Sequence, residues 1–194
     1  MNIIEYRGFW IKTEQDKDAT SPRENDNIGT MVCSHRKYNL GNIQNMDQDE
    51  FDKIRNSLEY ISLPIYMYEH SGITISTKPF NSYFDSGLLG MIYVEIEKAK
   101  KEWGELFSIQ TVENGLNAEV EEYNQYLTGD VWCYFVYDKN PEENEDSEPL
   151  DSCCGFYGED FCVGEAKRVI DYHADEKLKE FIPGMEPKEL KKEE

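Results

Sequence analysis

The chain has 194 residues, with 40 acidic and 20 basic side chains, a formal net charge of −20 and 39% hydrophobic residues. That length and hydrophobic content predict a folded chain, with a single domain over residues 1–182 and a flexible charged tail over 183–194. The negative charge repels nucleic acid and anionic lipid, so we expect no direct nucleic-acid binding. No apolar run reaches the roughly 18 residues of a membrane span, and the first residues lack a signal peptide, so we expect a cytoplasmic protein.

Apolar spacing predicts the elements of the first half. Residues 3–13 alternate loosely and suit one short opening strand, and the partly β-branched run 28–33 suits a buried strand. Residues 46–60 repeat apolar side chains at three- and four-residue steps, which predicts an amphipathic helix. Residues 62–68 and 73–77, separated by a serine–glycine turn, predict a β-hairpin.

The second half continues this mixture of strands and helices. The predicted elements are a strand at 91–94, helices at 95–103 and 111–127, strands at 131–137 and 150–157, and a helix at 162–181. Residues 131–137 are all aromatic or apolar, which predicts a strand in the middle of a sheet. The acidic, proline-containing segment 140–149 predicts a solvated loop inside a hairpin. Irregular alternation with prominent hairpins predicts an α+β fold, a mostly antiparallel sheet with helices packed on one face.

The cysteines predict reduced thiols. There are five of them, an odd number without a CxxC spacing, which argues against a disulfide framework and a zinc ribbon. Cys153 and Cys154 are adjacent, so a strand directs their side chains to opposite faces. We therefore expect the cysteines to be buried and reduced.

Acidic residues provide the first candidate site. Residues 1–97 carry a net charge of −6 and residues 98–194 a net charge of −14. Carboxylates along a rigid face can copy the phosphates of a duplex, so these residues are candidates for binding a basic partner. They are Glu113, Glu119, Glu121, Glu122, Asp130, Glu142 and Glu143. The alternative is a solvated acidic surface that serves solubility alone.

Polar residues beside glycine-containing turns provide a second candidate site. They are His35, Arg36, His70, Asp85, Ser86, Asp130 and Asp151. Asp130 and Asp151 flank the predicted hairpin, where paired carboxylates at one end could transfer protons or hold a divalent ion. The alternatives are structural histidines and turn-capping aspartates. The three histidines follow no metal-binding spacing, and common nucleotide-binding signatures are absent, so we expect no metal or cofactor.

Several blocks of sequence together resemble a protein family of phages, prophages and other mobile elements of Gram-positive bacteria. The blocks are SPR at 21–23, NIGTMVCSHRKYNLG at 27–41, LPIYMYEHSGIT at 63–74, DSGLLGMIYV at 85–94, YNQYLTGDV at 123–131 and DSCCGFYG at 151–158. Phe84 and Cys154 stand where the family usually has tryptophan. The resemblance implies no known activity. It implies a phage-like setting, in which small acidic proteins often block restriction enzymes or CRISPR effectors.

Two functional hypotheses follow. The first is an acidic binding protein, rather than an enzyme, that inhibits a host defence protein by occupying its basic nucleic-acid-binding surface. It predicts a contiguous acidic face containing Glu119, Glu122 and Asp130. The second is a protein or enzyme that binds a small ligand or nucleotide, with a pocket holding a histidine together with Asp85 or Asp151. Neither hypothesis specifies an oligomeric state.

Overall fold

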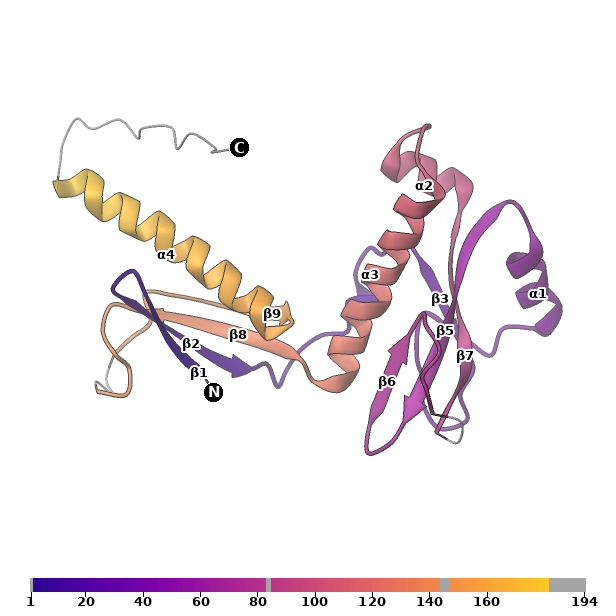
Figure 1. Ribbon diagram of the computed structural model, residues 1–194, viewed down its shortest axis with the longest axis horizontal. Helices are drawn as coiled ribbons and strands as arrows, with labels where there is room; N and C mark the ends of the chain where they lie inside the picture. Colours follow the sequence, from indigo (N-terminus) through magenta and orange to yellow (C-terminus); the bar gives the residue numbers. More distant parts are fainter. Residues whose placement is uncertain (1, 83–84, 144–146, 182–194) are drawn as a thin grey trace. The chain divides into compact units, whose positions relative to one another are not determined.

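The computed structural model describes residues 2–82, 85–143 and 147–181, without the side chains of residues 173 and 175–181 (Figure 1). The chain divides into two compact units. Unit 1 comprises Met1–Lys17 and Val131–Glu194, and unit 2 comprises Asp18–Asp130. One domain over residues 1–182 stays a prediction, and the tail predicted at 183–194 lies outside the described residues.

Unit 1 is an antiparallel sheet with a long helix (Figure 1). Its elements are β1 (Asn2–Tyr6), β2 (Phe9–Gln15), β8 (Val131–Tyr137), β9 (Asp151–Tyr157) and α4 (Glu159–Phe181). The strand order is β1-β2-β8-β9. β8 therefore lies inside its sheet and forms a hairpin with β9, and both predictions are confirmed.

The first two strands form a hairpin where the sequence predicts one strand. Arg7 and Gly8 separate them and have φ angles of 52° and 80°. Two consecutive residues of positive φ make the tight turn whose twist suits an antiparallel hairpin. The single strand predicted at 3–13 is therefore wrong, because its apolar alternation continues through a two-residue turn.

Helix α4 packs on one face of the unit 1 sheet. The strands contribute the buried side chains of Phe9, Ile11, Tyr134 and Val136, and the helix contributes Cys162, Ala166 and Ile170. The helical residues recur every four positions and therefore lie on one side of α4. The helix begins at Glu159, three residues before the predicted start at 162.

Unit 2 contains a five-stranded sheet of order β4-β3-β7-β5-β6 (Figure 1). Its elements are the 3-10 helix η1 (Pro22–Glu24), β3 (Thr30–Cys33), β4 (Ile43–Gln44), α1 (Gln48–Asn56), β5 (Tyr60–Glu69), β6 (Ile73–Ser76), β7 (Ser86–Glu95), α2 (Ile96–Trp103) and α3 (Ile109–Thr128). All strand pairs are antiparallel except β3 with β4.

Helices lie against both faces of this second sheet. Ile92 of β7 packs with Leu116 of α3 in the main core. Met91, the preceding strand residue, packs with Ile54 of α1 in a smaller cluster. Since neighbouring strand residues point to opposite faces, α1 and α3 cover different faces of the sheet.

The α+β fold class agrees with the sequence, but helices cover both faces of the unit 2 sheet and not the one face that was predicted. The described residues form α-helices and two mostly antiparallel sheets, an α+β fold. The predicted β-hairpin and the helices at 46–60, 95–103 and 111–127 correspond to β5–β6, α1, α2 and α3. Among the described residues, none of the helices combines the length and apolar character that crossing a membrane requires.

Candidate functional site

A pocket in unit 2 gathers three of the seven polar residues of the second candidate site. Its volume is about 320 Å³, at the lower end of the range for small-ligand sites. The lining residues are Ser34, His35, Met67, Glu69, Asp85, Ser86, Gly87, Leu88 and Leu89. Three segments that are distant in the sequence therefore meet where β3 and β5 end and β7 begins.

The pocket exists because β7 extends beyond its neighbour β3. Cys33, the last residue of β3, pairs with Gly90, so residues 86–89 of β7 have no partner on that strand. The two backbones approach closely here: a Cβ atom at Gly90 would lie 1.9 Å from the carbonyl oxygen of Val32. Glycine is therefore required at the position where the sheet opens into the pocket.

Backbone hydrogen bonds fix the two walls of the pocket. The Ser34 amide donates to the carbonyl oxygen of Leu89 over 2.9 Å. The Glu69 amide donates to the carbonyl oxygen of Asp85, also over 2.9 Å, and ties the end of β5 to the segment before β7. The pocket is thus attached to the sheet on both sides.

Glu69 is the centre of a polar cluster in this pocket. Its Oε1 accepts a hydrogen bond from the Tyr38 hydroxyl at 3.2 Å and lies 3.4 Å from Lys37 Nζ. Its Oε2 lies 3.8 Å from His35 Nε2. Burial raises the pKa of Glu69, but the hydrogen bonds and charge supplied by Tyr38 and Lys37 outweigh that effect and lower it. Glu69 is therefore an ionised, already compensated carboxylate at neutral pH.

The ring of His35 is held on three sides. It stacks on Tyr38 with ring centroids 5.0 Å apart. Its Nδ1 accepts a hydrogen bond from the Lys37 amide at 3.3 Å, so in the neutral ring the proton lies on Nε2, which faces Glu69. Nδ1 is thus occupied as an acceptor and Nε2 lies near a carboxylate, so His35 organises the pocket instead of offering a free base.

Ser86 and Asp85 differ in their availability to a ligand. The Ser86 hydroxyl donates to the carbonyl oxygen of Ser82. The Asp85 side chain is exposed and has no hydrogen bond or ion pair with another residue in the described part of the chain. Asp85 is therefore the carboxylate of this pocket that can pair with a ligand.

The other residues of the second candidate site lie elsewhere. Arg36 is exposed and outside the pocket lining, and His70 is an exposed turn residue stacked on Tyr68. Asp130 ends unit 2, whereas Asp151 in unit 1 accepts a hydrogen bond from the Tyr134 hydroxyl at 3.0 Å. Burial, with this bond and the charge of Asp151, raises the pKa of Tyr134.

The predicted pairing of Asp130 with Asp151 is wrong. In the register of the β8–β9 hairpin, Val131 pairs with Tyr157 and Val136 pairs with Asp151. Asp151 therefore lies at the end of β8 remote from Asp130. Asp130 precedes the first strand of the hairpin, and Asp151 follows the loop between the two strands. Because the strands are antiparallel, these two positions lie at opposite ends of the hairpin.

The candidate acidic residues do not share one environment. Glu121, Glu142 and Glu143 are exposed, and Glu113, Glu119, Glu122 and Asp130 are partly buried. Burial and the nearby charge of Glu119 raise the pKa of Glu122. Glu142 and Glu143 belong to unit 1, and the remaining five belong to unit 2.

Glu119 is directed into unit 2 and cannot serve an exposed face. Its side chain is only 14% exposed and lies 2.8 Å from Arg23, whose side chain is 4% exposed. It also accepts hydrogen bonds from the amides of Ile28 and Gly29 at 2.8 and 3.0 Å. The contiguous face predicted through Glu119, Glu122 and Asp130 therefore lacks one of its three carboxylates.

Arg23 completes this buried network. Its guanidinium donates to Asn42 Oδ1, Asn27 Oδ1 and the carbonyl oxygen of Gly29, at distances of 2.6 to 3.2 Å. Together with the bond to Glu119, these bonds use all five N–H donors of the Arg23 side chain. The SPR motif at 21–23 is therefore a structural feature that anchors the segment before β3 to α3.

The acidity is shared equally between the units. Unit 2 has 19 acidic and nine basic residues, and unit 1 has 21 and 11, so each carries a net charge of −10. The imbalance between the sequence halves arises because unit 1 contains both ends of the chain. It does not correspond to one acidic unit and one nearly neutral unit.

Two cysteines form a disulfide, contrary to the prediction of reduced thiols. Cys133 in β8 is bonded to Cys154 in β9, with Cα atoms 3.9 Å apart. Cys33, Cys153 and Cys162 are free, and burial raises the pKa of Cys33 and of Cys162 to about 12. The hairpin register was the missing signal: Tyr134 pairs with Cys153, so one further step places Cys133 opposite Cys154.

Comparisons with known proteins do not extend this description. The chain matches no protein-family model, no curated protein and no solved structure. The resemblance to a family of mobile-element proteins therefore stays a prediction.

Proposed function

We propose that the protein is a binding protein whose unit 2 pocket receives a cationic group, such as a guanidinium or an ammonium. The observation that carries the proposal is the convergence of two carboxylates in one pocket, only one of which is compensated. Glu69 is paired with Lys37 and Tyr38, whereas Asp85 has no such partner among the described residues. A cation entering the pocket would complete the charge balance at Asp85.

The remaining lining suits an organic cation. Met67, Leu88 and Leu89 supply apolar surface beside the carboxylates. An arginine or lysine side chain, or a small amine, presents an aliphatic body with a charged end, which matches this combination. The net charge of −20 favours approach of basic molecules.

The pocket favours binding over catalysis. The Ser86 hydroxyl is donated to Ser82, and both ring nitrogens of His35 face partners. Among the described lining residues, no nucleophile is paired with a free base, which is the arrangement that nucleophilic catalysis needs. We therefore favour a recognition pocket.

Nuclear magnetic resonance can test this proposal with small probes. We expect N-acetyl-arginine amide to shift the amide signals of residues 34–38, 67–69 and 85–89, and the oppositely charged N-acetyl-glutamate amide to leave them unchanged. Asp85→Asn should weaken arginine binding roughly two- to fivefold, the effect of losing an exposed ion pair.

The matched control is Glu105→Gln, which removes one exposed negative charge from unit 2 outside the pocket lining. Equal weakening by both variants would assign binding to net charge and would contradict the pocket.

A second function is favoured by the exposure of acidic side chains in both units. It is the inhibitor of a host defence protein that occupies a basic nucleic-acid-binding surface, with the face made from residues other than Glu119. Exposed carboxylates in unit 2 include Glu97, Glu102, Glu105 and Glu121. Such a surface attracts the phosphate-binding grooves of nucleic-acid enzymes.

An affinity capture from a Gram-positive lysate tests this second function. The supporting result is a restriction or CRISPR nuclease that is retained at low salt, released at high salt and displaced by duplex DNA. A captured partner that duplex DNA fails to displace would exclude occupation of its nucleic-acid groove.

A further inference from the structure

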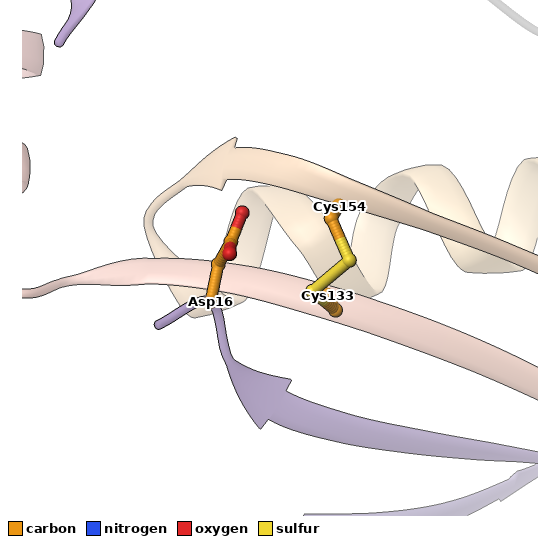
Figure 2. Close-up of side chains that lie close together, drawn as sticks. All are labelled: Asp16, Cys133 and Cys154. Carbon is orange, nitrogen blue, oxygen red and sulfur yellow. A yellow bond between two sulfur atoms is a disulfide. The ribbon is translucent and has the colours of Figure 1, made fainter. Parts of the chain in front are cut away.

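Three side chains with metal-binding atoms gather in unit 1. A carboxylate oxygen of Asp16 and the sulfur atoms of Cys133 and Cys154 all lie within 4.8 Å of one another. Figure 2 shows the Asp16 carboxylate beside the disulfide that joins the two cysteines. This cluster lies in a different unit from the cation pocket.

Neighbouring strands hold these three residues. Asp16 directly follows β2, and its amide donates to the carbonyl oxygen of Val131 in β8 over 2.8 Å. Cys133 lies two residues further along β8, and Cys154 lies opposite it on β9. Cys133 is buried and Cys154 is exposed, so the cluster has a protein side and a solvent side. Two of the ligands thus lie in paired strands, and the third lies one residue beyond a strand.

We propose that Asp16, Cys133 and Cys154 form a Zn²⁺ site once the disulfide is reduced. Two thiolates and a carboxylate are ligands that zinc accepts, whereas Mg²⁺ and Ca²⁺ require oxygen ligands. Tetrahedral bond lengths place two zinc-bound sulfurs about 3.8 Å apart and a bound sulfur and oxygen about 3.6 Å apart. In the oxidised protein the two sulfurs are bonded to each other, so they must move apart on reduction, whereas the Asp16 carboxylate oxygen already lies within 4.8 Å of both. Water fills the fourth position on the solvent side.

The local backbone allows the sulfur atoms to separate. The β8–β9 register shifts between Trp132 and Tyr134, so Cys154 and Gly155 together oppose Cys133. This irregularity is a β-bulge, in which the extra residue is released from regular pairing and its side chain can be redirected. Gly155 has a φ of 86°, a conformation that suits glycine. Cys154 can therefore rotate without disturbing the paired part of the hairpin.

A dithiol can supply the two electrons and two protons that reduction of the disulfide requires. One thiolate of the dithiol attacks the exposed Cys154 sulfur, the disulfide bond breaks, and Cys133 leaves as a thiolate. The second thiol of the reductant then displaces Cys154 and closes the reductant's own disulfide. Two electrons and two protons pass to the protein, and Zn²⁺ displaces those two protons when the thiolates bind. Oxidised and metal-bound forms are thus mutually exclusive.

Cobalt provides a spectroscopic test on the full chain. The protein is reduced with dithiothreitol, desalted without oxygen and titrated with Co²⁺. We expect a thiolate-to-cobalt charge-transfer absorption that saturates at one equivalent and disappears when Zn²⁺ is added. The oxidised protein should show no such absorption.

Three variants separate this site from adventitious thiols. Cys154→Ser should remove at least half of the charge-transfer absorption. Asp16→Asn should keep this absorption but weaken Co²⁺ binding at least about tenfold, because even the loss of a group that only contacts a metal ligand weakens metal affinity that much. The matched control is Cys153→Ser, which removes the adjacent exposed thiol and should change neither the charge-transfer absorption nor the affinity for Co²⁺. Circular dichroism of each variant verifies folding.

Three outcomes would overturn the proposal. Reduced protein without a charge-transfer absorption would show that the thiolates do not bind the metal. An unchanged titration for Cys154→Ser would place the metal on other cysteines. Unchanged affinity for Asp16→Asn would remove the carboxylate from the site.

Discussion

The two units share a plan but are fastened differently. Each has a mostly antiparallel sheet covered by a long helix, α4 in unit 1 and α3 in unit 2. In unit 1 two neighbouring strands are joined by the Cys133–Cys154 bond. In unit 2 the segment before β3 is joined to α3 by the buried Arg23–Glu119 pair. The same architecture is thus stabilised by a covalent bond in unit 1 and by a buried ion pair in unit 2.

This difference teaches that the units respond to different conditions. A disulfide stabilises mainly by restricting the unfolded chain and is lost on reduction. A buried ion pair is unaffected by reductant but becomes strongly destabilising when one partner is removed, because the other is left charged and desolvated. Amide hydrogen exchange, followed separately for residues 18–130 and for the rest of the chain, can therefore distinguish loss of the disulfide from loss of the ion pair.

Glu119→Ala should have the largest effect. It leaves the Arg23 guanidinium buried without its counter-ion and removes the acceptor of the Ile28 and Gly29 amides. We expect the free energy of unfolding to fall by about 3–5 kcal/mol, measured by urea denaturation. Its control, Glu121→Ala, alters an exposed acid on the same helix and should change stability by less than about 0.5 kcal/mol.

Amide hydrogen exchange shows which part of the chain loses stability in this variant. Faster exchange confined to residues 18–130 would support separate folding of unit 2. Faster exchange throughout the chain would support the single cooperative domain that the sequence predicts over 1–182. Unchanged stability would contradict the structural role of the ion pair.

Removing the disulfide should have the next largest effect. The bond closes a loop with a sequence separation of 21 residues, for which the chain-entropy model gives about 3 kcal/mol. Cys154→Ser should lose about that amount, whereas Cys153→Ser should lose little, because Cys153 is exposed and free. Reductant should destabilise wild type and leave Cys154→Ser unaffected; equal sensitivity would disprove the assignment.

Glu122→Gln should have the smallest effect and the opposite sign. Because burial and the charge of Glu119 raise the pKa of Glu122, the folded state holds this proton more tightly than the unfolded chain does. The ionised carboxylate therefore lowers stability above its folded pKa, and this penalty disappears as the pH falls through the folded pKa to below the unfolded value. The variant should be slightly more stable than wild type at pH 7, and the difference should vanish in acid; a constant difference across pH would contradict the explanation.

Local patterns in the sequence were sufficient for most elements of the fold. Helix α3 follows from apolar residues at helical spacing, and β8 from its aromatic and β-branched composition. The Arg7–Gly8 turn was missed because apolar alternation continues on both sides of it. Periodicity describes a segment's faces, and it cannot show by itself that the segment reverses direction.

The sites depended on tertiary pairing and were therefore predicted only in part. Proximity to glycine-containing turns indicates His35, Asp85 and Ser86. It does not indicate Glu69, because an acid at a strand end resembles ordinary solvated charge. The sequence predicts a surface position for Glu119 because spacing along a helix does not reveal a buried arginine 96 residues away. Such pairings arise between segments that no local pattern connects.

The path of the chain through unit 1 has a final consequence. Strands β2 and β8 pair directly, although the whole of residues 18–130 separates them, and the Asp16 amide closes this junction on Val131. Unit 2 therefore leaves and re-enters the sheet at neighbouring points, as if it replaced the loop of an ordinary hairpin. An element with adjacent ends can be cut out or transplanted into a surface loop of another protein with little disturbance to its host. In evolutionary terms, unit 2 has the connectivity of an inserted segment, and unit 1 has the connectivity of the domain that receives the insertion.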